Sequence, residues 1–320
     1  MPSGDVGVAH GSRLVAGLAF ALVSAATFGL SGPLARPLLE AGWSPGAIVL
    51  IRISIAALVV LPFGVVSLRG RWAVLRRNAG LVTVYGVLAV AGAQFCYFSA
   101  VAHMQVGPAL LIEYTAPAAV VCWQWLRHGQ RPGRVTLIGA ALAGVGLVLV
   151  LDLVSGADLD PVGVLWALAA MVGAATYFVI SADEDNGMPP MVLAAGGLMV
   201  GGVALGLAGL VGLLPMEAAT TAVAYAGVDV DWWVPLVVLG VVTAAIPYTT
   251  GIAAGRRLGS RLASFVALTE VVAGVLFAWL LLDELPRPIQ LVGGLLILAG
   301  VVGVKMGERT TAVDHSLELP

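Results

Sequence analysis

The chain has 320 residues, of which 60% are hydrophobic and only 11% are charged. Its mean hydropathy is strongly positive, at +1.01. Because so little polar surface could not cover a soluble globule of this length, composition excludes that class and indicates a protein of the lipid bilayer. The net charge of −2 says nothing about partners, since membrane orientation depends on where the basic residues lie.

Ten apolar runs predict ten membrane-spanning helices. A helix needs about 20 apolar residues to cross a hydrocarbon core of about 30 Å, and each run approaches or exceeds that length. The connections are short and leave no room for a soluble domain. We therefore predict an all-α integral membrane fold, with spans at residues 14–34, 47–66, 81–101, 106–126, 135–151, 162–180, 191–213, 233–254, 262–282 and 289–304.

The ends of the chain and the first run set the predicted boundaries. Residues 1–13 and 307–320 are polar and are predicted to be cytoplasmic tails. The first run stays apolar well past its small residues and follows a single basic residue, Arg13, which favours a retained helix over a secretory signal. Between the tails, we predict two five-helix repeats, at 14–152 and 153–306.

Weak internal similarity supports the repeats. Residues 24–28 (S-A-A-T-F) align with residues 173–177 (G-A-A-T-Y). The longest connection of the first half carries four arginines, whereas its counterpart in the second half is purely acidic. An odd number of spans per repeat inverts the second copy in the membrane, which is the architecture of many transporters that work by alternating access.

The basic residues support the same topology. A cytoplasmic N terminus leaves Arg36 and Arg287 on the outer side and places Arg52 inside the membrane. All other basic residues then lie on the cytoplasmic side, as the positive-inside rule requires, and we predict a multi-pass protein of the inner or plasma membrane with both termini cytoplasmic. The cytoplasmic set is Arg13, Arg69, Arg71, Arg76, Arg77, Arg127, Arg131, Arg134, Arg256, Arg257, Arg261, Lys305 and Arg309.

Four short motifs lie within the predicted helices or at their ends, namely residues 51–56 (I-R-I-S-I-A), 113–117 (E-Y-T-A-P), 268–270 (L-T-E) and 280–284 (L-L-L-D-E). In these motifs the chain resembles the EamA-type, ten-helix family of the drug/metabolite transporter superfamily, and the resemblance covers nearly the whole chain. Two positions depart from the family pattern: Val271 replaces a common proline, and Asp283 replaces a common glycine. The resemblance implies the export of small metabolites such as amino acids or related compounds.

Three charged residues lie inside the predicted helices, namely Arg52, Glu113 and Glu270. Each costs about 2.5 to 3.5 kcal/mol there, so each needs a partner or a function. Arg52 and Glu113 lie at similar depth, which allows either a structural clamp between two helices or direct contact with a substrate. Arg52 stays protonated and cannot carry the coupling proton.

Glu270 is the candidate proton carrier. It lies near mid-membrane with no basic residue predicted at its level, and such a carboxyl group can load and release a proton as the cavity changes sides. The alternative is a neutral Glu270 that donates a hydrogen bond to a neighbouring helix. Protons are therefore a candidate coupling ion.

Helix breaks and polar or aromatic side chains suggest the rest of the site. Pro117 and Pro247 cannot donate to the carbonyls of Glu113 and Thr243, and free carbonyls at membrane depth need partners. A pocket with a few polar groups among aromatic rings suits a small amphipathic solute. The remaining candidate lining residues are Thr27, Phe28, Gln94, Tyr97, Tyr114, Thr176, Tyr177, Tyr248 and Thr269.

Other functions fit the sequence less well. The four histidines lie far apart, no His-Glu-x-x-His or phosphate-binding glycine motif is present, and Cys96 and Cys122 fall in apolar runs. We therefore predict no enzyme activity, no metal, no cofactor and no nucleic-acid partner. The expected protein is a secondary transporter, a monomer or a homodimer, that exports small metabolites. An importer or facilitator of a vitamin, nucleobase or sugar derivative is the alternative, with a membrane receptor or scaffold more remote.

Overall fold

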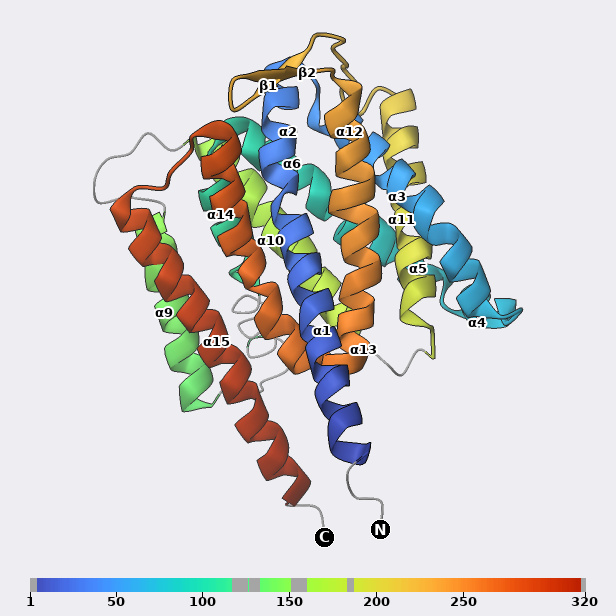
Figure 1. Cartoon of the computed structure of the whole chain (residues 1–320), viewed down its shortest axis with the longest axis vertical. Helices are drawn as coiled ribbons and strands as arrows, with labels where there is room; N and C mark the ends of the chain where they lie inside the picture. Colours follow the sequence, from blue (N-terminus) through green and yellow to red (C-terminus); the bar gives the residue numbers. More distant parts are fainter. Residues whose placement is uncertain (1–4, 117–125, 127–132, 151–159, 183–186, 318–320) are drawn as a thin grey trace.

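A computed structural model describes residues 5–116, 126, 133–150, 160–182 and 187–317. The described chain forms a bundle of helices in which both chain ends lie at one end and a small hairpin lies at the other (Figure 1). We refer to these as the terminal end and the hairpin end. Among the described residues, five helical segments are long and apolar enough to cross a membrane, and four shorter apolar helices accompany them.

Where the chain is described, the helices overlap the predicted runs. Segments α5, η1 and α6 join into one helical stretch, as do α12, η2 and α13. In chain order the elements are α1 (Asp5–Gly29), α2 (Ser31–Glu40), α3 (Pro45–Leu68), α4 (Trp72–Arg77), α5 (Ala79–Val84), η1 (Tyr85–Gly92), α6 (Ala93–His103), α7 (Val106–Glu113), α9 (Arg134–Val150), α10 (Pro161–Ala182), α11 (Pro190–Leu210), β1 (Val223–Tyr225), β2 (Val228–Val230), α12 (Trp233–Gly240), η2 (Val241–Ala245), α13 (Ile246–Ala267), α14 (Thr269–Leu282) and α15 (Pro288–Leu317).

Several helices extend beyond the predicted boundaries. Helix α1 begins at Asp5 and α15 continues to Leu317, so both predicted tails are largely helical. Helix α13 also continues through the basic segment 255–261, which was predicted to be a loop. The reason is that hydropathy marks where a helix leaves the apolar layer, whereas the backbone stays helical until a breaker or a turn ends it.

The hairpin β1–β2 is the element that the sequence did not predict. Its strands have three residues each, with Tyr225 opposite Val228. The two residues between them, Ala226 and Gly227, both have positive φ, as the tight turn of a two-residue hairpin requires. Strands this short show too little alternation to be recognised from sequence.

Helices α9 and α15 form a pair at the side of the bundle, where glycines bring the two backbones together (Figure 1). A Cβ on Gly139 would lie 2.6 Å from the carbonyl oxygen of Gly300, and one on Gly300 would lie 2.5 Å from that of Gly139. Gly146 and Gly293 meet in the same way, at 2.5 and 2.7 Å. Small residues at these four positions therefore allow the close helix approach that is common in membranes.

The central helices pack in a reciprocal pattern. Helix α1 packs against α13 and α14, while α10 packs against α6 and α7. Likewise, α3 packs against α12 and η2, while α11 packs against η1. Gly86 and Gly240 permit the second pair of crossings, since a Cβ there would lie within 2.8 Å and 2.5 Å of α11 and α3, respectively. The two π-helical segments thus lie in comparable places in the two halves of the chain.

Candidate functional site

Arg52 of α3 lies buried at the centre of the bundle, with 2% of its surface exposed. One terminal nitrogen, Nη2, donates to the carbonyl oxygen of Thr243 at 2.7 Å, and the guanidinium lies 5.2 Å from the centre of the Phe98 ring. Pro247 has no N–H to offer the Thr243 carbonyl, which explains why this oxygen is available. The Nε of Arg52 has no hydrogen-bond partner among the described residues.

Gln94 and Tyr97, one turn apart on α6, add two more unpaired polar atoms. The side chain of Gln94 lies near the hydroxyl of Tyr248, and its Oε1 lacks a partner in the described part of the chain. The Tyr97 hydroxyl, on a ring that is 5% exposed, likewise has none there and lies against Gly32. A buried polar group without a partner is costly, so such groups in one region point to a ligand or to ordered water.

The two intramembrane carboxyl groups lie near Arg52 but do not pair with it directly. Glu113 and Glu270 interact electrostatically with each other and with Arg52. No described salt bridge joins Arg52 to Glu113, so the arginine clamps α3 to the Thr243 carbonyl instead. Glu270 accepts a hydrogen bond from the Tyr114 hydroxyl at 2.7 Å, which links α14 to the end of α7.

Aromatic rings surround this cluster. Phe28 of α1 meets Tyr248 edge to face, with ring centres 5.6 Å apart, and Tyr85 meets Tyr177 of α10 at 5.9 Å. Arg52, Gln94, Tyr97, Glu113, Tyr114, Tyr248 and Glu270 together form what we call the central cluster. It joins a single positive charge, two carboxyl groups and hydrogen-bonding side chains from both halves of the chain.

Other predicted residues contribute less. The hydroxyls of Thr27, Thr176 and Thr269 all bond carbonyls of the preceding turn and offer no free donor to the cluster. Pro117 lies outside the described residues, so the predicted kink there is not described. No group of three metal-binding side chains is present in the parts of the chain that the structure describes.

Two features of the site were not predicted from the sequence: the ring of Phe98 beside Arg52, and the π-helical segments η1 and η2. Phe98 lies one turn after Gln94 on the same helix face, a spacing that could have suggested its role beside Arg52. The π-helical turns of η1 and η2, which precede Gln94 and Tyr248, have no recognised sequence signal.

A bundle of apolar helices that encloses charged and polar groups is characteristic of membrane transport proteins. The EamA-like transporter family matches residues 15–152 and again residues 161–306, and the chain belongs to that family. The family is part of the drug/metabolite transporter superfamily.

Individual relatives agree with this assignment. The chain is 28% identical over 256 residues to a protein of Archaeoglobus fulgidus described as an uncharacterized transporter, covering 80% of this chain and 85% of the relative. It also resembles a solved structure described only as the crystal structure of a protein, with a TM-score of 0.61 and 21% identity. That similarity covers 94% of this chain and 99% of the other, and it concerns the fold alone.

Proposed function

We propose that this protein is a secondary active transporter that exports small metabolites, amino acids or related compounds, by alternating access at the central cluster. The observation that carries the proposal is Arg52, buried in the bundle with its Nε unpartnered among the described residues and two carboxyl groups within electrostatic range. Charges are expensive in a membrane and are retained there mainly for function.

The proposal includes ten spanning helices arranged as two inverted repeats. The family match to two successive segments supports the repeats. The reciprocal packing supports the inversion, because a two-fold axis in the membrane plane exchanges the Gly139–Gly300 contact with the Gly293–Gly146 contact. Gly139 and Gly293 are 154 residues apart, as are Gly146 and Gly300, and at the same spacing Gln94 and Tyr248 would be equivalent positions on either side of that axis.

We place the protein in the cell membrane with the terminal end in the cytoplasm. The distribution of Lys and Arg supports this orientation. The position of both chain ends on one side of the bundle is consistent with an even number of spans (Figure 1). The hairpin end would then face outward.

The chemistry of the central cluster suits a small zwitterion with an apolar part. A guanidinium with a free N–H can hold a carboxylate of the solute, and Glu113, which has no described hydrogen-bond partner, can face an ammonium group. Phe28, which is partly exposed and lies against the ring of Tyr248, offers aromatic surface to the remainder. A bare inorganic ion would leave most of this surface without a role.

Glu270 is proposed as the proton carrier. Its contact with Tyr114 supplies a donor that holds the ionised carboxylate, and its electrostatic interaction with Arg52 links its charge to the site where the solute would bind. The alternative is a structural Glu270 that only ties α14 to α7. Reconstituted Glu270→Gln protein distinguishes them: loss of solute-driven proton flux supports the carrier role, and retained flux excludes it.

The experiment that tests the function compares the metabolites of the medium from cells with and without the protein. Export predicts that one class of small zwitterions accumulates outside only when the protein is present. Depletion of a solute from the medium would support the importer alternative. No change in any solute would count against transport of metabolites.

A further inference from the structure

The segment 213–231, which contains the hairpin, bridges the two halves of the chain at the hairpin end. It is anchored first at Ser44, the N-cap residue of α3. The Ser44 hydroxyl donates to the carbonyl of Pro215 at 2.8 Å and accepts from the amide of Glu217 at 3.0 Å. The Ser44 amide in turn donates to the carbonyl of Glu217. We call this segment the strap.

The second anchor of the strap is the hairpin itself. The hydroxyl of Tyr225, a residue that is 8% exposed, donates to the carbonyl of Leu34 in α2 at 2.7 Å. Next to it, the amide of Ala226 donates to the carbonyl of Leu281 near the end of α14 at 3.0 Å. The strap therefore joins α2 of the first half to α14 of the second.

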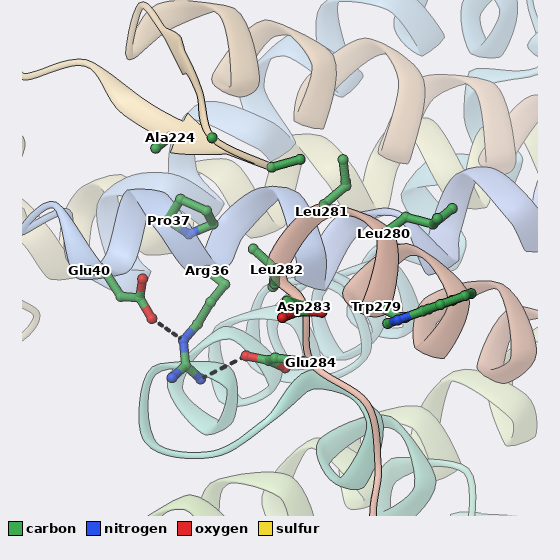
Figure 2. Close-up of a pocket in the computed structure, with 12 residues that line it drawn as sticks. Arg36, Pro37, Glu40, Ala224, Trp279, Leu280, Leu281, Leu282, Asp283 and Glu284 are labelled. Carbon is green, nitrogen blue, oxygen red and sulfur yellow. Dashed lines mark hydrogen bonds and ion pairs between the residues drawn. The ribbon is translucent and has the colours of Figure 1, made fainter.

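Arg36 of α2 lies below the hairpin and completes the bridge (Figure 2). Its Nη1 donates to the carbonyls of Val101 and Met104, both at 2.8 Å, and lies 4.0 Å from Oε1 of Glu284. Glu284 also accepts from the amide of Val106, the first residue of α7, at 3.2 Å. These contacts hold α2, α6, α7 and the end of α14 together.

The same region borders an open cavity of about 560 Å³ between the hairpin, α2 and the end of α14. Arg36, Glu40, Asp283 and Glu284 line it together with Trp279 (Figure 2). The Arg36–Glu284 bridge lies beside this open space and can break and re-form without repacking the hydrophobic core, of which Val223 and Tyr225 of the strap are part. This distinguishes the region from the close glycine contacts of α9 and α15.

We propose that the strap and the Arg36–Glu284 bridge form a latch that holds the hairpin end of the bundle closed and sets how often the central cluster opens to that side. The proposal rests on alternating access as described above. Breaking a contact present only in the closed state shifts the balance toward the open one by the free energy of that contact. Loss of a latch contact should therefore expose the cluster from the hairpin side.

Cys96 offers a reporter that needs no transported solute. It lies on α6 beside Tyr97, is partly buried and interacts electrostatically with Glu113. In a Cys122→Ser background, the rate at which a membrane-impermeant thiol reagent modifies Cys96 measures access to the cluster. Adding the reagent to either face of sealed vesicles separates the two sides.

We expect Arg36→Gln and Tyr225→Phe to raise the labelling rate from the hairpin side about tenfold each and to lower it from the terminal side. Glu40→Gln is the matched control, because Glu40 contacts Arg36 from the same helix and does not bridge the halves. The control should label at the parental rate.

Two outcomes overturn the latch: unchanged labelling in folded Arg36→Gln and Tyr225→Phe proteins, or equal acceleration by Glu40→Gln. Tyr225→Phe removes a single oxygen, so it keeps the test valid where Arg36→Gln fails to fold. A failure of the proposed export function is separately visible, because it abolishes solute movement and leaves the two-sided labelling pattern intact.

Discussion

The α9–α15 pair and the central cluster differ in how they use the two halves of the chain. In the pair, Gly139 meets Gly300 and Gly146 meets Gly293, so the same backbone contact is made twice. In the cluster, Gln94 corresponds to Tyr248 under the proposed repeat, and Arg52 has no charged counterpart in α11. Packing can be satisfied by repeated small residues, whereas recognition of an asymmetric solute needs different side chains in the two copies. The two halves are therefore alike at the positions that pack the helices together, and they differ at the positions where we expect the solute to bind.

The largest effect is expected at Arg52. Arg52→Leu removes a buried charge together with its hydrogen bond to the Thr243 carbonyl, and a hydrogen bond to a charged group contributes about 1.5 to 3 kcal/mol. We expect transport of the solute found by metabolite profiling to fall at least about 100-fold, which corresponds to about 2.7 kcal/mol. Arg134→Gln, a charge loss on the exposed start of α9, is the control and should transport normally. Normal transport by the Arg52→Leu protein would show that the solute does not bind at the central cluster.

Substitutions at the glycine contacts between α9 and α15 should lower the free energy of unfolding. Gly139→Ala and Gly293→Ala would each force backbones apart, at a cost of about 1 to 3 kcal/mol in unfolding free energy. The two losses should be similar, because the contacts are alike. A Cβ added at Gly144 would meet no other atom within 4 Å, so Gly144→Ala should leave the unfolding free energy unchanged or raise it slightly. Thermal unfolding in detergent measures all three, and an equal loss at Gly144 would contradict the role given to the pair.

Tyr114→Phe should have a smaller effect, confined to function. It removes the hydroxyl that bonds Glu270 and leaves the ring in place. A hydrogen bond to a charged group contributes about 1.5 to 3 kcal/mol, so we expect proton-coupled transport to fall about tenfold or more. Thr176→Val, which removes a hydroxyl bonded only within its own helix, is the control. If both variants behave like the wild type, the Tyr114–Glu270 contact has no part in coupling.

The smallest effect is expected at Asp160, between the two halves. The backbone amide of Val162 and then the ring of His103 bond its carboxylate and lower its pKa below the ordinary value. A lowered folded-state pKa stabilises the fold above the unfolded pKa, about 3.9, and this contribution fades as pH falls through the folded value. Asp160→Asn should therefore unfold slightly earlier than the wild type at pH 6, and the gap should narrow near pH 3. A constant gap would show that the charge is not responsible.

The sequence predicted the class of fold because apolar length is read directly from residues. It predicted apolar segments that overlap the described helices, and it singled out Arg52, Glu113 and Glu270 because charged residues are rare in apolar runs. The position of Pro247 pointed to the Thr243 carbonyl, which accepts a hydrogen bond from Arg52, since a missing amide is a property of the residue itself.

The rest depended on tertiary packing. Depth along a helix allowed Arg52 and Glu113 to pair, but helix rotation decides which side chains meet, and the described hydrogen bond of Arg52 goes to Thr243 in η2. The helical extensions of α1, α13 and α15 lie in polar sequence that gives no apolar signal. The hairpin was missed because three-residue strands are stabilised by contacts such as Tyr225 to Leu34, which no local pattern shows.

Protection of Cys96 by the transported solute tests the central claim most directly. In Cys122→Ser protein, we expect the solute to slow thiol labelling of Cys96, with half-maximal protection near its transport KM, because it occupies the cluster beside Tyr97. The Arg52→Leu variant should label at the unprotected rate at every solute concentration. Transport without protection of Cys96, or protection that survives Arg52→Leu, would contradict the assignment of the central cluster as the solute site.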